Sequence, residues 1–190
     1  MSQENGRDYF YYSANQHSIQ IELMADLVCN FVRQRTEPDA GQGHAFSVFI
    51  KFFRLQLGVA GIPERFSDIT DWYIGGHSLG GAMAASYAAK HTDELDGLVL
   101  LAAYSTADLT DSGLRVYSTY SSEDGVLNRE KYEADRINLP QDTTETVIDG
   151  GCHAGFGSYG AQKGDGAPVI SAEEQQQQTA DALAAWMNLQ

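Results

Sequence analysis

One serine in this chain lies in a context that suits nucleophilic chemistry. Ser78 stands in the frame Gly76-x-Ser78-x-Gly80, after an apolar run and before a run of small residues. This pattern predicts a buried strand, a tight turn and a helix, with the serine hydroxyl projecting above the end of a sheet. Glycine is needed on both sides because the strand and helix backbones pass close together. The alternative is a phosphate site at the helix N-terminus, but a P-loop would need a lysine after its second glycine, and none is present.

A serine hydroxyl is a weak nucleophile that needs a base to accept its proton and a third group to orient that base. After Ser78 the chain places Asp124 at the end of one predicted strand and His153 at the end of the next. These two residues are therefore candidates for the partners of the serine. Glu123 and Asp149 stay open as rival acids, and an aspartate in Asp-Gly also favours turns.

The other four histidines suit the role of base less well. His17 and His44 precede the serine, and His91 at a predicted helix end suits interaction with the helix dipole. His77 adjoins the serine but is expected on the other side of the turn. For His153 itself, the alternative is a loop histidine satisfied by backbone groups.

The chain after residue 71 alternates short apolar runs with longer helical patterns, which is typical of a parallel sheet with helices across its faces. Strands are predicted at 72–75, 98–102, 114–120 and 144–148, and helices at 82–91, 129–138 and 172–189. The loop 154–168 holds five glycines and is expected to be mobile. The glutamines at 175–178 are interpreted as a solvated helix face. The predicted fold class is α/β, with a mostly parallel sheet flanked by helices.

The first third of the chain is less regular. Residues 1–20 are expected to be irregular or a short strand. Apolar residues from Ile19 to Arg33 recur at intervals of three and four, which predicts an amphipathic helix. A strand is predicted at 46–50 from its phenylalanine and β-branched residues, and a short helix at 63–66.

The segment 72–186 resembles the serine-dependent α/β-hydrolase superfamily, and most of all its compact, lidless, esterase-like or lipase-like branch. Gly-His-Ser-Leu-Gly-Gly at 76–81, Ser-Glu-Asp-Gly at 122–125 and Gly-Gly-Cys-His at 150–153 carry the resemblance. It implies a catalytic triad in which Ser78 is the nucleophile, His153 the general base and then general acid, and Asp124 the residue that orients the histidine. It also implies that the backbone N–H of Leu79 is one donor of the oxyanion hole.

The first 65 residues depart from the pattern of that superfamily. Its members carry a His-Gly-Gly-like or Pro-Gly-Gly-like turn before the nucleophile, which supplies the second oxyanion donor. Neither 41–43 nor 58–61 matches such a turn. We therefore expect one α/β-hydrolase domain over 1–190, with a divergent part at 1–65 and a catalytic core at 66–190. The divergent part is either a shortened natural variant or the result of truncation or alteration.

Charge and composition exclude several other functions. The formal charge of −14, from 26 acidic and 12 basic residues, disfavours nucleic acid and anionic membrane surfaces as partners. No secretory signal or membrane-spanning segment is apparent, so a cytoplasmic protein is expected. Cys29 and Cys152 are too few for a disulfide framework and are not spaced as a metal site, so both are expected to be reduced thiols, with Cys152 a buried packing residue. The oligomeric state stays open.

The predicted function is hydrolysis of a carboxylic ester or related acyl bond in a small molecule, through an acyl-enzyme and without a cofactor or metal. The segment 102–114 is too short for a large lid, so the site is expected to be open to solvent. His77, Tyr104 and Phe156 are candidates for substrate contact, although the two aromatic residues suit the core or the surface equally well. The alternatives are an acyltransferase with the same triad, and a non-catalytic or impaired binding domain with an incomplete oxyanion hole.

Overall fold

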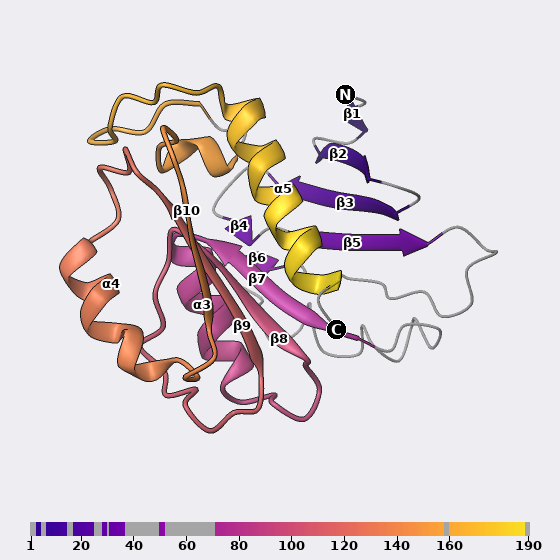
Figure 1. Ribbon diagram of the computed structural model, residues 1–190, viewed down its shortest axis with the longest axis vertical. Coiled ribbons are helices and arrows are strands. Elements are labelled where there is room, and N and C mark those ends of the chain that lie inside the picture. Colours follow the sequence, from indigo (N-terminus) through magenta and orange to yellow (C-terminus); the bar gives the residue numbers. More distant parts are fainter. Residues whose placement is uncertain are drawn as a thin grey trace.

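The computed structural model describes the backbone of residues 3–4, 7–14, 17–24, 28–29, 31–36, 50–51, 71–157 and 160–188, and the side chains of 71–157 and 160–187. Residues 71–188 contain a sheet of four parallel strands in the order β10-β9-β8-β7. The strands are β7 (Tyr73–His77), β8 (Gly97–Leu101), β9 (Arg115–Ser121) and β10 (Thr144–Ile148). Figure 1 shows this sheet with helices on both sides. The α/β fold class predicted from the sequence is thereby confirmed.

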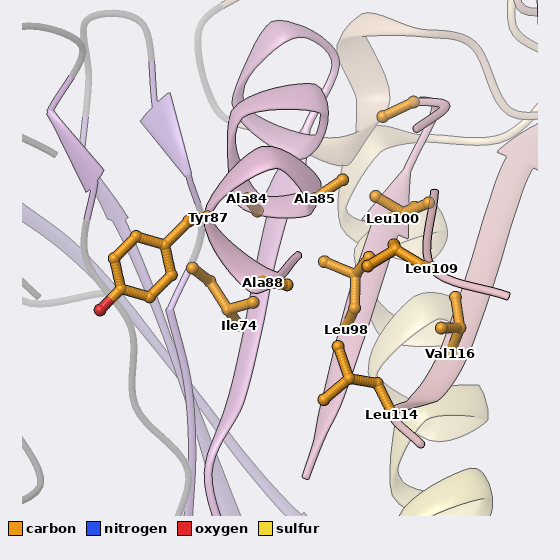
Figure 2. Packing of buried hydrophobic residues seen from close by; sticks show 11 residues of the cluster. Ile74, Ala84, Ala85, Tyr87, Ala88, Leu98, Leu100, Leu109, Leu114 and Val116 are labelled. Atoms are coloured by element: carbon orange, nitrogen blue, oxygen red, sulfur yellow. The ribbon is translucent and has the colours of Figure 1, made fainter. Parts of the chain in front are cut away.

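Helix α3 (Leu79–Ala88) covers one face of the sheet. Its alanines pack against side chains that alternate along the strands, such as Ile74, Leu98 and Leu100, all of which are fully buried. Figure 2 shows Ala84, Ala85 and Ala88 facing this layer. Small side chains let the helix lie close to the sheet, as the sequence predicts for the residues after Ser78.

Helix α5 (Ala172–Asn188) covers the opposite face. The intervening residues of the same strands, among them Tyr73, Val99 and Tyr117, point to this side and pack with Leu183 and Trp186 of the helix. Both faces of β7 and β8 are thus covered, which explains why these two strands are buried along their full length, whereas the edge strand β10 is only partly buried. No helix of the described residues is long and apolar enough to cross a membrane.

The parallel register brings three loops to one edge of the sheet. His77 pairs with Leu101, and Ser121 pairs with Ile148, at the carboxyl ends of the strands. The loops after β9 and β10 therefore emerge next to each other, and the turn after β7 emerges at the same end of the sheet, separated from them by the end of β8. This edge is where the sequence predicts the functional residues to meet.

The remaining elements after residue 71 also agree with the prediction. The surface helix predicted at 129–138 is α4 (Arg129–Asp135) continued by η1 (Arg136–Asn138). Asn128 caps α4, since its side chain accepts a hydrogen bond of 2.9 Å from the Lys131 N–H. A short 3-10 helix, η2 (Ala154–Phe156), follows the loop after β10.

The helix predicted from Ile19 to Arg33 is wrong. The structure has two strands there, β3 (His17–Met24) and β5 (Phe31–Thr36), which pair antiparallel with Ile21 opposite Val32. Ile19, Ile21 and Leu23 alternate with polar residues, and this two-residue period decides the local structure over the weaker three-to-four-residue spacing.

The other described residues of the first third are also strands. β1 (Gln3–Glu4) and β2 (Arg7–Ala14) join β3 and β5 in a four-stranded antiparallel sheet. The strand β2 is thus longer than the short or irregular segment expected. β4 (Val28–Cys29) pairs with β6 (Ile50–Lys51). The strand predicted at 46–50 lies outside the described residues except for its last position, and the helix predicted at 63–66 lies outside them entirely.

The interpretation of the glutamine run as a solvated face is wrong for Gln175. Its side chain is 1% exposed, and its amide donates hydrogen bonds of 2.8 Å to the Ser121 hydroxyl and to the Cys152 carbonyl. Its Oε1 accepts a bond of 3.0 Å from the Cys152 N–H. Residues 151 and 155 are glycines because a Cβ at either position would collide with this side chain. Gln177 and Gln178 are exposed, as the sequence predicts.

We expect Gln175→Ala to lower the free energy of unfolding by about 2 kcal/mol or more, because it leaves buried backbone and hydroxyl groups without partners. Chemical denaturation measures the change. The matched control is Gln178→Ala, an exposed glutamine in the same helix, for which a change within about 0.5 kcal/mol is expected. Equal effects of the two substitutions would contradict the buried role of Gln175.

Candidate active site

Ser78 occupies a strained turn between β7 and α3. Its backbone has φ 54° and ψ −125°, a conformation that non-glycine residues rarely adopt. Its N–H donates a hydrogen bond of 2.9 Å to the carbonyl of Leu101, at the end of the adjacent strand. Its hydroxyl makes no capping bond to α3, the usual structural use of a serine at this position. Strain of this kind costs on the order of 1–3 kcal/mol and is concentrated at functional sites.

The glycines around Ser78 allow the close approach that the sequence predicts. A Cβ on Gly76 would collide with the backbone of Gly80. A Cβ on Gly81 would collide with Ala103, at the loop after β8. The turn is therefore fixed from both sides, by the strand before it and by the neighbouring strand end.

Asp124 and His153 meet at the same edge of the sheet. The Nδ1 of His153 lies 2.8 Å from the Oδ2 of Asp124, and the two side chains are 1% and 0% exposed. The second oxygen of Asp124 accepts hydrogen bonds of 2.9 Å and 2.8 Å from the N–H groups of Val126 and Leu127. Asp124 thus accepts hydrogen bonds both from its own turn and from His153, so it is more than a turn residue, and its role as the catalytic acid stays a prediction.

The two rival acids lie elsewhere. Glu123 is exposed and accepts a hydrogen bond of 3.0 Å from the Ser122 hydroxyl, and Asp149 is exposed after β10. Burial alone opposes ionisation of Asp124, but hydrogen bonds from His153, Leu127 and Val126 outweigh it and lower the pKa of this carboxyl. Asp124 is therefore a carboxylate at neutral pH.

Because Asp124 is ionised, it determines which ring nitrogen of His153 carries the proton when that ring is neutral. A carboxylate only accepts hydrogen bonds, so Nδ1 carries the proton and Nε2 presents a lone pair. Within the part of the chain that the structure describes, the buried Nε2 has no hydrogen-bond partner. A buried imidazole nitrogen in that state is an acceptor for a proton from an adjacent donor.

Leu79 is the first residue of α3 and is 47% exposed beside the nucleophile candidate. Backbone N–H groups in the first turn of a helix lack intrahelical partners, and the helix dipole favours negative charge there. This geometry suits the predicted oxyanion donor. The segments 41–43 and 58–61, considered for a second donor, lie outside the described residues.

His77 does not lie away from the site, contrary to the expectation from the turn. Its ring centroid is 4.5 Å from that of His153 and 5.7 Å from that of Phe156, and the residue is 7% exposed. Burial lowers the pKa of His77 to about 3. It is therefore a neutral ring packed beside His153 at physiological pH.

The two aromatic candidates for substrate contact differ in position. Phe156, in η2, is 3% exposed and belongs to the hydrophobic cluster beneath α5, so it is a core residue. Tyr104 is half-buried in the loop after β8. Cys152 is a buried free thiol whose pKa is raised mainly by burial, as expected of a packing residue. No cluster of metal-ligating side chains occurs among the described residues.

A model of the alpha/beta hydrolase family matches residues 50–177, which is most of the chain. The chain belongs to this family. This membership agrees with the resemblance of the sequence motifs and with the parallel sheet of Figure 1. A search of curated proteins found no match to this α/β-hydrolase.

Three similar solved structures come from microorganisms. A predicted CIB-like hydrolase from Thermoplasma acidophilum has 12% identity and a TM-score of 0.47, with 93% of this chain and 97% of that chain covered. A structure described among carboxylesterases of Nitrososphaera gargenis has 14% identity and a TM-score of 0.47, covering 66% and 67%. An alpha-beta serine hydrolase homologue from Coxiella burnetii has 13% identity and a TM-score of 0.45, covering 80% and 91%.

The sequence does not predict two residues that contact the His153 loop. Gln175 binds the backbone of Cys152, and Asp165 binds the backbone of His153 and Ala154. Neither lies in a recognisable motif. The glycines at 151, 155 and 166 are the only local signal, since they mark places where another group approaches the backbone closely.

The pKa of His77 predicts a pH dependence of the stability of this α/β-hydrolase. In the unfolded chain a histidine has a pKa of about 6.5, so between that value and about 3 the unfolded chain binds one proton more than the folded protein. His77 therefore lowers the free energy of unfolding by about 1.4 kcal/mol for each pH unit of acidification below pH 6.5.

Urea denaturation of the wild type and of His77→Gln between about pH 6 and pH 4.5 isolates this effect, because the other titrating groups are common to both proteins. The variant is expected to lose stability less steeply as the pH falls. Parallel pH profiles would show that His77 is not held neutral by the fold.

Proposed function

We propose that this α/β-hydrolase cleaves carboxylic esters or related acyl bonds of small molecules through an acyl-enzyme on Ser78. The observation that carries the proposal is the Asp124–His153 pair. The carboxylate accepts a hydrogen bond from the protonated Nδ1 of His153, so the lone pair lies on Nε2, which is buried and has no hydrogen-bond partner among the described residues. The strained turn at Ser78 supplies the hydroxyl at the same edge of the sheet.

In the proposed first step, His153 Nε2 takes the proton of the Ser78 hydroxyl while Oγ bonds to the acyl carbon. The negative charge on the carbonyl oxygen is stabilised by the Leu79 N–H and the N-terminus of α3. His153 then gives its proton to the leaving alcohol, and the carbon–oxygen bond to that alcohol breaks. Asp124 keeps the imidazole oriented and stabilises its positive charge throughout.

In the second step, water replaces the alcohol. His153 removes a proton from the water as the oxygen attacks the acyl-enzyme, and returns the proton to Ser78 as the acid is released. The charge of the protein, −14, fits a neutral or cationic small molecule better than a polyanion. An acyl acceptor other than water would give the acyltransferase reaction with the same residues.

We expect the wild type to hydrolyse p-nitrophenyl acetate or butyrate, and Ser78→Ala to lower kcat by a factor on the order of 10⁴ to 10⁶. The matched control is Ser86→Ala. Ser86 lies on the same helix, and its hydroxyl donates a bond of 3.0 Å to the Ala82 carbonyl of that helix, so near-wild-type turnover is expected.

A Ser78→Ala variant as active as the wild type would exclude the serine mechanism. A folded wild type without turnover on the ester series would favour the non-catalytic domain. Faster product release on addition of an alcohol or thiol, with formation of the transferred ester or thioester, would identify an acyltransferase instead.

A further inference from the structure

Asp165 lies in the glycine-rich loop between η2 and α5, and its carboxylate joins two loops of the candidate site. Its Oδ1 accepts hydrogen bonds from the N–H of Gly125, at 3.2 Å, and from the N–H of His153, at 3.0 Å. Its Oδ2 accepts one of 2.8 Å from the N–H of Ala154. Gly125 follows Asp124 directly, so one side chain connects the backbone of the acid loop to that of the histidine loop.

The loop around Asp165 packs closely on the acid loop. A Cβ on Gly166 would collide with the carbonyl of Glu123. A Cβ on Gly125 would lie 2.6 Å from the carbonyl oxygen of Gly164. The glycines therefore let the two backbones come together, and the mobility expected for loop 154–168 is not supported at Asp165.

Four backbone N–H groups donate to the Asp165 carboxylate, since Gly166 adds a bond of 2.9 Å to Oδ1, and these donors also determine its charge. Burial opposes ionisation, but the bonds from Ala154, His153 and Gly125 outweigh it and lower the pKa of Asp165. The group is a carboxylate at neutral pH, and charge-assisted bonds of this kind are about twice as strong as those to a neutral acceptor. A neutral side chain would hold the two loops less firmly.

We propose that Asp165 is a positioning residue. It holds the backbone of residues 153 and 154 against the Asp124 loop, so that the His153 ring keeps its hydrogen bond to Asp124. The inference rests on the proposed function, because its consequence for rate requires the Ser78 reaction. Asp165 does not touch the reacting atoms. It acts through His153, whose displacement by about 1 Å can cost on the order of 10² in rate.

The test compares Asp165→Ala and Asp165→Asn with the wild type in the full chain. For ester hydrolysis we expect kcat to fall on the order of 10²-fold in Asp165→Ala, with KM within about twofold, because orientation is lost and substrate contacts are not. Asp165→Asn keeps one acceptor oxygen in place and should retain part of the rate. Asp111→Asn, which removes an exposed acid elsewhere, is the matched charge control and should keep the wild-type rate.

A second readout does not depend on activity. The nitrogen NMR shifts of the His153 ring, assigned with His153→Gln, report which nitrogen carries the proton. In the wild type we expect the proton on Nδ1, and in Asp165→Ala a shift toward a mixture of the two tautomers. The control Asp111→Asn should match the wild type.

Unchanged ring shifts in a folded Asp165→Ala protein would overturn the proposal, as would a loss of unfolding free energy with kcat intact. If the alanine variant does not fold, the same two readouts on Asp165→Asn decide, and wild-type values in both would overturn it. Absence of ester turnover in the wild type would instead count against the proposed function, and the ring shifts would still test the positioning role.

Discussion

The hydrogen bond between Asp124 and His153 is the interaction on which the geometry of the site depends. Both side chains are almost fully removed from water, and a buried carboxylate is stable only when its oxygens are satisfied. Asp124 meets this condition with the histidine on one oxygen and the Val126 and Leu127 N–H groups on the other. The pair can form only because parallel strands β9 and β10 end in register, with Ser121 opposite Ile148.

The surrounding structure maintains that bond from several directions. Gln175 of α5 ties the Cys152 backbone to Ser121, so the helix that covers one face of the sheet also locates the histidine loop. Asp165 approaches the same loop and joins it to the residue after Asp124. Much of the C-terminal segment thus serves a single local geometry, and the glycines within it are the places where these groups approach the backbone.

The sequence predicts the parallel sheet and its two covering helices because β7 and β8 are short runs buried along their full length, for which local pattern and tertiary context agree. The order of Ser78, Asp124 and His153 at strand ends also predicts where the candidate active site lies. The segment from Ile19 to Arg33 carries two periods at once, and the two-residue period corresponds to the observed structure, in which β3 pairs with β5. The roles of Gln175 and Asp165 depend on tertiary approach to distant backbone groups, which neighbouring residues in the chain do not encode.

We propose that Ser78 becomes covalently acylated with the help of His153. The most direct measurement is mass spectrometry of the protein quenched in acid shortly after mixing with p-nitrophenyl acetate, followed by peptide mapping. We expect one acetyl group per chain, located on Ser78, and a large loss of this species in His153→Ala. Acetylation of another residue at equal rate in the wild type and in Ser78→Ala, or rapid ester turnover without any acylated serine, would contradict it.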